Sequence, residues 1–202
     1  MVLSGKTEAM RKIRDEVVML TASPLCAYRI EAGNMPVIGE GSHDAQIMFV
    51  GEAPGKNEAK TGRPFCGAAG KILDKLLASA NIPREEVYIT NIVKDRPPQN
   101  RDPLPEEITL YAPFLDKQIA IIEPKVIAPL GRYAMNYIMT RLGLELSLEP
   151  ISVAHGKEYT AHVEHGDVVI IPLYHPAVAI YNNSQYPVLE EDFKQLTKYY
   201  GV

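Results

Sequence analysis

Short apolar runs alternate with longer amphipathic segments over most of the chain. The runs at residues 47–50, 126–130 and 168–173 are bounded by glycine, proline or polar positions. They are too short to be helices between such residues, so they predict buried strands. Residues 87–93 (VYITNIV) are rich in β-branched side chains and predict one more strand.

The longer segments carry apolar side chains at the three- and four-residue spacing of an α-helix. Pro105 and the two glutamates after it suit the first turn of such a helix, and Pro113 is expected to kink it. The predicted helices and their inward side chains are, in chain order, Met10, Ile13, Val17 and Leu20; Ile72, Leu73, Leu76 and Leu77 in residues 71–80; Ile108, Tyr111, Leu115 and Ile119 after Pro105; residues 132–142; and Leu189, Phe193, Leu196 and Tyr200.

The repeated order of strand and helix predicts an α/β fold with a four-stranded parallel sheet and helices on both faces. Residues 151–170 interrupt this order and predict a hairpin or an irregular excursion. The sequence has no linker and no internal repeat, so residues 1–202 are expected to form a single domain.

Composition narrows the class of protein. The 202 residues are 46% hydrophobic and 23% charged, close to the average for globular proteins. No run approaches the roughly 20 apolar residues of a membrane span, and the charged N-terminal segment has no signal-peptide core. We therefore expect an intracellular, cytoplasmic protein with no membrane partner.

Metal ligands are scarce. Cys26 and Cys66 are too few for a disulfide framework or for a thiolate metal site within this chain. His162 and His165 flank Glu164, but a solvated hairpin explains this pattern better than a metal does. No metal site is predicted.

Positive charge is concentrated in one segment. The net charge of −4 argues against general adhesion to nucleic acid, yet residues 56–101 hold nine basic and five acidic side chains. This segment is therefore +4 and the remainder −8. A basic region on an acidic body suits a local anionic ligand such as a DNA backbone.

Chemically useful residues follow the predicted strands. In an open parallel sheet, ligands bind beyond the carboxyl ends of the strands. Glu52, Asn91 and His175 supply a carboxyl group, an amide and an imidazole at three of these ends, with Gly51 and Gly55 permitting close backbone approach. The predicted topology gathers these groups on one rim.

Each of these residues has a structural alternative. Glu52 could cap the following turn, His175 could be a core histidine, and Phe65 in GRPFCG could be ordinary packing. Asn91 inside an apolar strand needs a hydrogen-bond partner, or its burial costs on the order of 1–3 kcal/mol. That partner could be structural or a ligand.

Four segments carry a family resemblance: GEAPGKNEAKTGRPFCGAAGKIL, TNIVKDRPPQNR, PLGRYA and YHPA. Together they resemble the motifs of the uracil-DNA glycosylase superfamily, with family 4 as the nearest type, from about Val37 to the end of the last helix. The resemblance implies a monofunctional DNA glycosylase that flips uracil out of DNA and hydrolyses its N-glycosidic bond, leaving an abasic site.

The resemblance also implies roles. His175 would donate to uracil O2, with Gly51, Ala53 and Gly55 contributing backbone contacts. Asn91 would read the Watson–Crick edge, and Phe65 would stack on the base. Glu52 would orient water or stabilise the cationic sugar, although many superfamily members place an aspartate where this chain has Ala53.

Further residues are expected to contact DNA. Lys94, Arg96 and Arg101 flank the second motif and would meet phosphates. Residues 178–181, which follow the histidine motif, would wedge into the vacated base stack.

Two departures from the family stand out. Typical family 4 enzymes hold a [4Fe–4S] cluster with four cysteines, whereas here Asp95, Tyr111 and either Tyr28 or Arg29 stand where three cysteines are expected beside Cys26. We predict that the cluster is absent and that packing and hydrogen bonds bridge the same segments. Residues 96–105 also lack the histidine of a covalently trapping branch, so suicide attachment to DNA is not expected.

The motifs are also compatible with other functions. The same motifs could belong to a non-catalytic reader of deaminated bases, or to a glycosylase for hypoxanthine, xanthine or mismatched thymine. An unrelated nucleotide-binding domain has little support, because neither GxxxxGK[ST] nor GxGxxG occurs. The expected partner is single- or double-stranded DNA containing uracil, bound by a monomeric protein of prokaryotic type.

Overall fold

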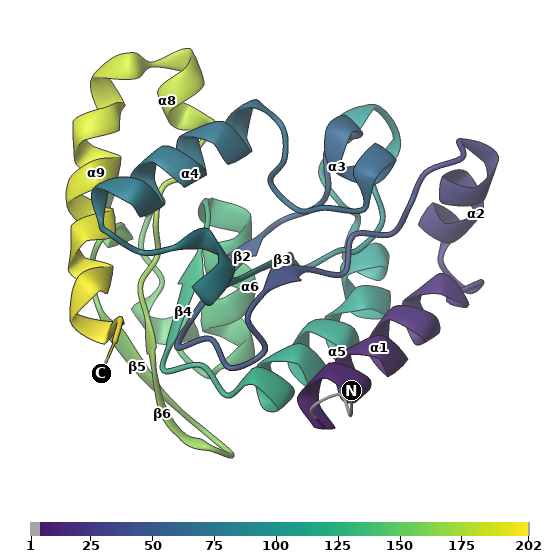
Figure 1. Ribbon diagram of the computed structural model, residues 1–202, viewed down its shortest axis with the longest axis horizontal. Helices are drawn as coiled ribbons and strands as arrows, with labels where there is room; N and C mark the ends of the chain where they lie inside the picture. Colours follow the sequence, from purple (N-terminus) through teal and green to yellow (C-terminus); the bar gives the residue numbers. More distant parts are fainter. Residues whose placement is uncertain (1–4, 202) are drawn as a thin grey trace.

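A six-stranded sheet forms the centre of the computed structural model, which describes residues 5–201 (Figure 1). The strand order is β1-β3-β2-β4-β6-β5. The strands are β1 (Glu40–Gly41), β2 (Ile47–Gly51), β3 (Tyr88–Asn91), β4 (Val126–Pro129), β5 (Tyr159–Val163) and β6 (Gly166–Ile170).

The four central strands, β3, β2, β4 and β6, are parallel. They are the four strands that the sequence predicts, so the α/β fold is confirmed. β1 and β5 add antiparallel edges, and β5 with β6 forms the hairpin expected within residues 151–170. The sheet is therefore larger than predicted, because both edge strands are short or half-exposed and lack a buried apolar run.

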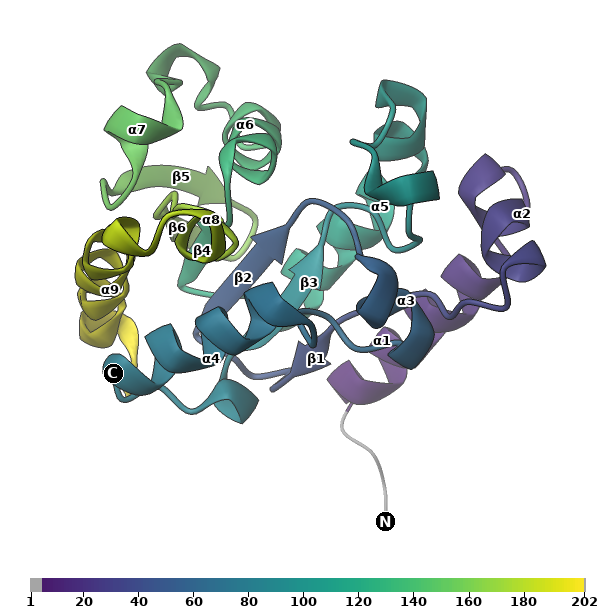
Figure 2. The same cartoon turned by 90° about the horizontal axis from the view of Figure 1, so that it is seen from above.

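Helices cover both faces of the sheet (Figure 2). α4, α8 and α9 lie together on one face, and α1 runs along α5 on the other (Figure 1). The helices are α1 (Gly5–Val18), α2 (Pro24–Glu31), α3 (Lys56–Thr61), α4 (Ala68–Ser79), α5 (Pro105–Ile122), α6 (Arg132–Arg141), α7 (Ile151–Ala154), α8 (Val178–Tyr181) and α9 (Tyr186–Lys194), with 3₁₀ turns at Arg84–Glu86, Pro98–Asn100, Glu145–Ser147, Asn183–Gln185 and Gln195–Tyr199.

Alternation along the central strands divides the apolar side chains between two layers. Met48 and Val50 of β2 join the layer under α1, α5 and α6, whereas Ile47 and Phe49 join the layer under α4 and α9. All five residues of β2 are buried, as a strand covered on both faces requires. The described elements share this one sheet, so they form a single domain.

The predicted helices are present with shifted ends. α5 continues through Pro113 as one helix. α1 ends at Val18, before Leu20, and the last predicted helix divides into α9 and the 3₁₀ turn that contains Leu196. Neither α2 nor α3 is among the predicted helices, because eight and six residues are too few to show a repeated apolar stripe. No helix among residues 5–201 combines the length and the apolar character needed to cross a bilayer.

A buried ion pair ties the first two helices to the sheet. Arg29 Nη1 in α2 lies 3.0 and 3.1 Å from the carboxylate oxygens of Asp95, and these side chains are only 6% and 0% exposed. Arg29 Nη2 also donates to Val18 O at 2.7 Å and to Cys26 Sγ at 3.2 Å. The Tyr111 hydroxyl of α5 donates to Asp95 Oδ2 at 2.6 Å.

This Arg29–Asp95–Tyr111 network joins α1, α2, α5 and the segment after β3 at one dry point. Burial raises the pKa of the Asp95 carboxyl, and the bonds from Tyr111 and Arg29 oppose that rise. Burial of this ion pair is compatible with a stable fold only while both partners are present, because a buried charge without a counter-charge strongly destabilises the folded state.

Asp95→Ala should therefore lower the free energy of unfolding by about 3–5 kcal/mol, since it leaves the Arg29 guanidinium buried without its counter-charge. Urea denaturation monitored by circular dichroism measures this change. Asp15→Ala, which removes an exposed carboxylate paired with Arg14, is the matched control and should change stability by less than about 0.5 kcal/mol. Equal effects of the two substitutions would show that the buried network contributes no more to the free energy of unfolding than an exposed ion pair does.

Candidate active site

The carboxyl ends of the central strands bring distant segments together. Gly51 at the end of β2 is in register with Asn91 at the end of β3. Beyond β6 the chain stays beside β4 as far as a bridge between Leu130 and Leu173, which leaves His175 at the same edge.

These segments enclose a cavity of about 230 Å³. Its volume lies below the roughly 300–1,000 Å³ of pockets for drug-sized ligands, so it suits a small planar group. The cavity therefore unites the three polar groups on which the sequence prediction depends. Its lining comprises Glu52, Ala53, Pro54, Gly55, Glu58, Phe65, Ala69, Asn91, Pro97, Asn100, Arg101, Asp102 and His175.

Gly51 lets the side chains of Asn91 and Phe65 meet. A Cβ atom at residue 51 would lie 2.3 Å from Asn91 Oδ1 and 2.9 Å from two atoms of the Phe65 ring. A side chain at residue 51 would therefore displace the Asn91 amide and the Phe65 ring from these positions. Gly70 has a similar role, because its Cβ would lie 1.8 Å from the carbonyl oxygen of Phe65.

The Asn91 side chain is buried but has no hydrogen-bond partner within residues 5–201. The residue is 2% exposed, and its bonded group is the backbone carbonyl, which accepts from Lys94. The side chain lines the cavity, so its amide donor and acceptor are open to a bound molecule. The arrangement favours a ligand as the missing partner.

His175 presents a neutral ring to the cavity. Its Nδ1 accepts the backbone N–H of Ala177 at 3.2 Å, which leaves the proton of the neutral ring on Nε2. Burial lowers the pKa of His175 to about 4, and the nearby negative charge of Glu58 only partly offsets this. The ring is therefore an uncharged donor at neutral pH, with its centroid 5.6 Å from that of Phe65.

Glu52 is poised between its two protonation states. Burial raises the pKa of its carboxyl to about 7; the negative charge of Asp102 adds to the rise, and Arg132 opposes it. Its Oε1 is buried with no hydrogen-bond partner among the described residues. The carboxyl group caps no turn in this part of the chain, which leaves it available to a bound molecule.

Lys94 is not at the surface, so the prediction that it contacts a DNA phosphate is wrong. Its side chain is 0% exposed, and its ammonium donates to Asn91 O at 2.6 Å, Gln118 Oε1 at 2.6 Å and Thr90 Oγ1 at 2.8 Å. The segment after β3 turns inward here, and the lysine supports the strand end from below.

The other two predicted phosphate contacts lie nearer the surface. Arg101 lines the cavity mouth, and its guanidinium forms two hydrogen bonds with the buried Glu107 carboxylate, at 2.6 and 2.8 Å. Arg96 is half-buried, and its Nε donates to Asn100 Oδ1 at 2.6 Å. Both arginines are thus held in defined orientations on the loop after β3.

Three polar lining residues were missed at the sequence level: Glu58, Asn100 and Asp102. Asn100 has φ of 56°, in a turn that hydrophobic periodicity does not register. Asp102 accepts from the Tyr133 hydroxyl at the start of α6, a contact between segments about thirty residues apart. Glu58 lies within the first motif, but the short helix α3 that orients it has no clear sequence pattern.

The fold and the cavity define a class of protein. An aromatic ring, a partnerless amide, a neutral imidazole donor and a carboxyl of raised pKa surround a space of nucleobase size. Perturbed pKa values clustered in a cleft are typical of catalytic sites. The fold and the cavity are therefore those of an α/β enzyme with a polar site for a small ligand.

Comparison with known proteins identifies the family. Residues 38–200 match the family described as the uracil DNA glycosylase superfamily. The chain belongs to this superfamily, as its motifs predict.

Individual relatives support type 4 as the nearest type. The chain is 45% identical to the type-4 uracil-DNA glycosylase of Sulfurisphaera tokodaii, over 94% of this chain and 84% of that protein. It is 41% identical to the type-4 enzyme of Thermotoga maritima, over 89% and 87%. A type-5 uracil-DNA glycosylase of Thermus thermophilus is 34% identical over 61% of this chain and 62% of that protein.

The Arg29–Asp95–Tyr111 network stands where the family 4 resemblance implies an iron–sulfur cluster. Arg29 contributes a cation there, and the Asp95 oxygens are already bonded to Arg29 and Tyr111. Cys66 is elsewhere, against Thr61. Within residues 5–201, no group of three or more histidine, cysteine or acidic side chains could hold a metal ion. These residues do not fit a cluster.

The raised pKa of Glu52 predicts a pH dependence. If the carboxylate form acts in the reaction, the single-turnover rate should rise with pH through about 7 and then level, because the carboxylate predominates above its pKa. Glu52→Gln should remove this rise and lower the plateau about 100-fold or more. Rates measured from pH 5 to pH 9 test this, and a substituted protein with the unchanged rate and profile would assign Glu52 a structural role only.

Proposed function

We propose that the chain is a monofunctional uracil-DNA glycosylase that hydrolyses the N-glycosidic bond of a flipped uracil and leaves an abasic site. The observation that carries this proposal is the cavity on which Glu52, Asn91, Phe65 and His175 converge. Membership of the superfamily and the type-4 relatives support the same reaction.

The reaction develops charge at two places. As the bond between C1′ and the base breaks, positive charge grows on the sugar and negative charge on uracil O2. A fixed donor at O2 is worth about 10²–10³ in rate. Neutral His175, with its proton on Nε2, suits this role, and backbone groups around Ala53 and Gly55 lie on the same cavity.

Uracil selection is assigned to Asn91. With its N–H₂ toward O4 and its oxygen toward N3–H, the amide pairs with uracil; in this orientation cytosine, with a donor at N4 and an acceptor at N3, is rejected. The absence of another partner within residues 5–201 leaves both groups for the base. Phe65 would stack on the flipped ring, an interaction worth roughly 1–3 kcal/mol.

Glu52 is assigned to the other side of the reaction. Its ionised form would orient the attacking water or stabilise the positively charged sugar, in the position next to Ala53, where many family members have an aspartate. Its raised pKa makes that ionised form available at and above neutral pH.

Contacts with the DNA strand are assigned to the rim. Arg96 and Arg101 would meet phosphates from the loop after β3. On α8, just beyond the histidine motif, Ile180 is 45% exposed and Tyr181 is 89% exposed. These two side chains are the best candidates for the wedge that fills the vacated stack. A monomer holds all of these groups.

The proposed enzyme works without an iron–sulfur cluster. The support is the buried network of Arg29, Asp95, Tyr111 and Cys26, which already connects the segments that a cluster would join. Purified protein is accordingly expected to contain no iron and no acid-labile sulfide, as measured by colorimetric assay.

The decisive experiment uses oligonucleotides that carry uracil, hypoxanthine or mismatched thymine in single and double strands. The wild-type chain should release free uracil from DNA, with strand cleavage after alkali, in a preparation free of iron. Asn91→Asp should relax the discrimination between uracil and cytosine or abolish activity, because the carboxylate lacks the amide donor.

Other outcomes have definite meanings. Binding without base release would indicate a reader of deaminated bases, and release of another base alone would indicate a different specificity. Unchanged rate and selectivity in Asn91→Asp would contradict the assignment of base reading.

Arg96→Ala should weaken binding of uracil-containing DNA about equally across flanking sequences and reduce the salt slope by roughly one, as expected for loss of one phosphate contact. Fluorescence anisotropy between low and moderate salt measures this. Lys12→Ala, on the exposed side of α1, removes the same charge away from the cavity and should leave the slope unchanged. An unaltered slope for Arg96→Ala would remove this residue from the DNA interface.

A further inference from the structure

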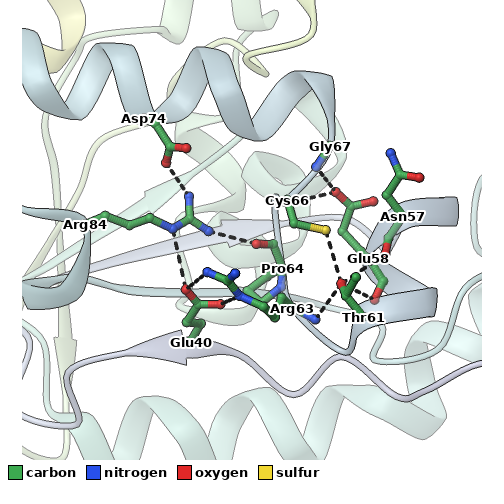
Figure 3. A network of polar contacts seen from close by, with 10 residues as sticks. All are labelled: Glu40, Asn57, Glu58, Thr61, Arg63, Pro64, Cys66, Gly67, Asp74 and Arg84. Atoms are coloured by element: carbon green, nitrogen blue, oxygen red, sulfur yellow. Dashed lines mark hydrogen bonds and ion pairs between the residues drawn. The ribbon is translucent and has the colours of Figure 1, made fainter.

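The loop that carries Phe65 holds this residue in an unfavourable backbone conformation. Phe65 lies between α3 and α4 with φ of 47°, in the left-handed region that bulky residues seldom adopt. Strain of this kind persists only where the surroundings fix the chain. Figure 3 shows the polar contacts that surround this loop.

Glu58 fixes the chain immediately after Phe65. Its Oε1 accepts the backbone N–H groups of Cys66 at 3.0 Å and Gly67 at 2.9 Å. Gly67 is the residue before α4, at its N-cap, and has no side chain to cap that helix, so a carboxylate from α3 satisfies these donors instead (Figure 3). A negative charge is also favourable at a helix N-terminus.

Arg84 fixes the chain immediately before Phe65. Its Nη2 donates to the carbonyl oxygen of Pro64 at 2.8 Å, and its Nη1 is held by Asp74 at 2.7 Å (Figure 3). The two backbone segments that flank Phe65 are thus gripped from opposite sides, by an anion and by a cation.

The Phe65 ring, which these contacts hold in place, forms part of the cavity wall. It lies close to Gly51, where even a Cβ would be 2.9 Å away, and its centroid is 5.6 Å from that of His175. The ring must therefore keep its place to stack on a base that Asn91 and His175 hold. A displacement of about 1 Å in such a site can lower the rate about 100-fold.

We propose that Glu58 is a positioning residue, which holds the Phe65 ring in place for the flipped base through the N–H groups of Cys66 and Gly67. This proposal rests on the proposed glycosylase function. A direct role is the competing explanation, because Glu58 also lines the cavity and its Oε2 lies 2.7 Å from the Cβ position of Gly55.

A double-mutant cycle separates the two explanations. It compares the wild-type chain with Glu58→Ala, Phe65→Ala and the double substitution, using single-turnover release of uracil from a single-stranded oligonucleotide. Glu58→Ala should raise the half-saturating enzyme concentration about tenfold, an effect within the range produced by losing a base-stacking contact, with a smaller change in maximal rate. In the Phe65→Ala background, Glu58→Ala should have no further effect.

Glu58→Gln provides rescue. Its amide oxygen can still accept both N–H groups, so this variant should stay within about twofold of wild type. Circular dichroism at the assay temperature checks that each variant is folded, and Glu85→Ala, which removes an exposed carboxylate, is the control for lost charge.

Three results would overturn the proposal: wild-type behaviour of Glu58→Ala, additive effects of the two alanine substitutions, or a loss in Glu58→Gln as large as in Glu58→Ala. The last would assign the charge itself to the reaction. The same cycle is measured by anisotropy with an oligonucleotide carrying uncleavable 2′-fluorinated deoxyuridine. A wild-type chain that binds this probe without releasing uracil would refute the proposed function, while the binding cycle would still decide the role of Glu58.

Discussion

The ion pair between Arg29 and Asp95 is the contact on which the arrangement of the chain depends most. Two charges removed from water destabilise a fold unless their hydrogen-bonding groups are satisfied. Here the guanidinium bonds to the end of α1, to Cys26 and to Asp95, and the carboxylate also accepts from Tyr111. Directional bonds from four segments specify one relative placement, which apolar packing alone would define less sharply.

The same contacts help to fix the position of the cavity residues. Asp95 lies four residues beyond Asn91, and Lys94 between them bonds to the carbonyl of Asn91 and to Gln118 of α5. The end of β3 is therefore held from beneath by satisfied polar groups. By contrast, Oε1 of Glu52 is buried without a partner in the described part of the chain. The amide of Asn91 faces the cavity, and among residues 5–201 only its backbone carbonyl is hydrogen-bonded. The polar groups that face the cavity are free to bind a ligand, whereas those beneath them are already hydrogen-bonded. This is the arrangement of a site that is organised before its ligand binds.

Periodicity and strand-end logic were enough to predict the parallel strands and the meeting of Glu52, Asn91 and His175. They succeed because a buried parallel strand is continuously apolar and ends at one edge of the sheet. They fail for Lys94, because a lysine just after a strand gives the same sequence pattern whether the chain turns outward or inward. They also miss Glu58, whose function depends on two N–H groups eight and nine residues away in the chain.

The contacts around Asp95 depend on which side chain of α2 reaches it. The family resemblance implies that Asp95 and Tyr111 stand where sulfur ligands are expected, with Tyr28 or Arg29 at another such position. In the structure it is Arg29 of α2 that bonds to Asp95. Whether two side chains can touch depends on their distance in the folded structure. Their spacing along the sequence does not give that distance.

The glycines beneath the cavity have a consequence for how this protein can evolve. A methyl carbon at residue 70 would lie 1.8 Å from the backbone oxygen of Phe65, and one at residue 51 would displace Asn91 Oδ1 from 2.3 Å away. Single substitutions at these two glycines would thus disturb the floor of the cavity. New substrate preferences would have to arise on the rim, in the exposed loop at residues 99–102, where side chains can lengthen or shorten into solvent without disturbing the floor.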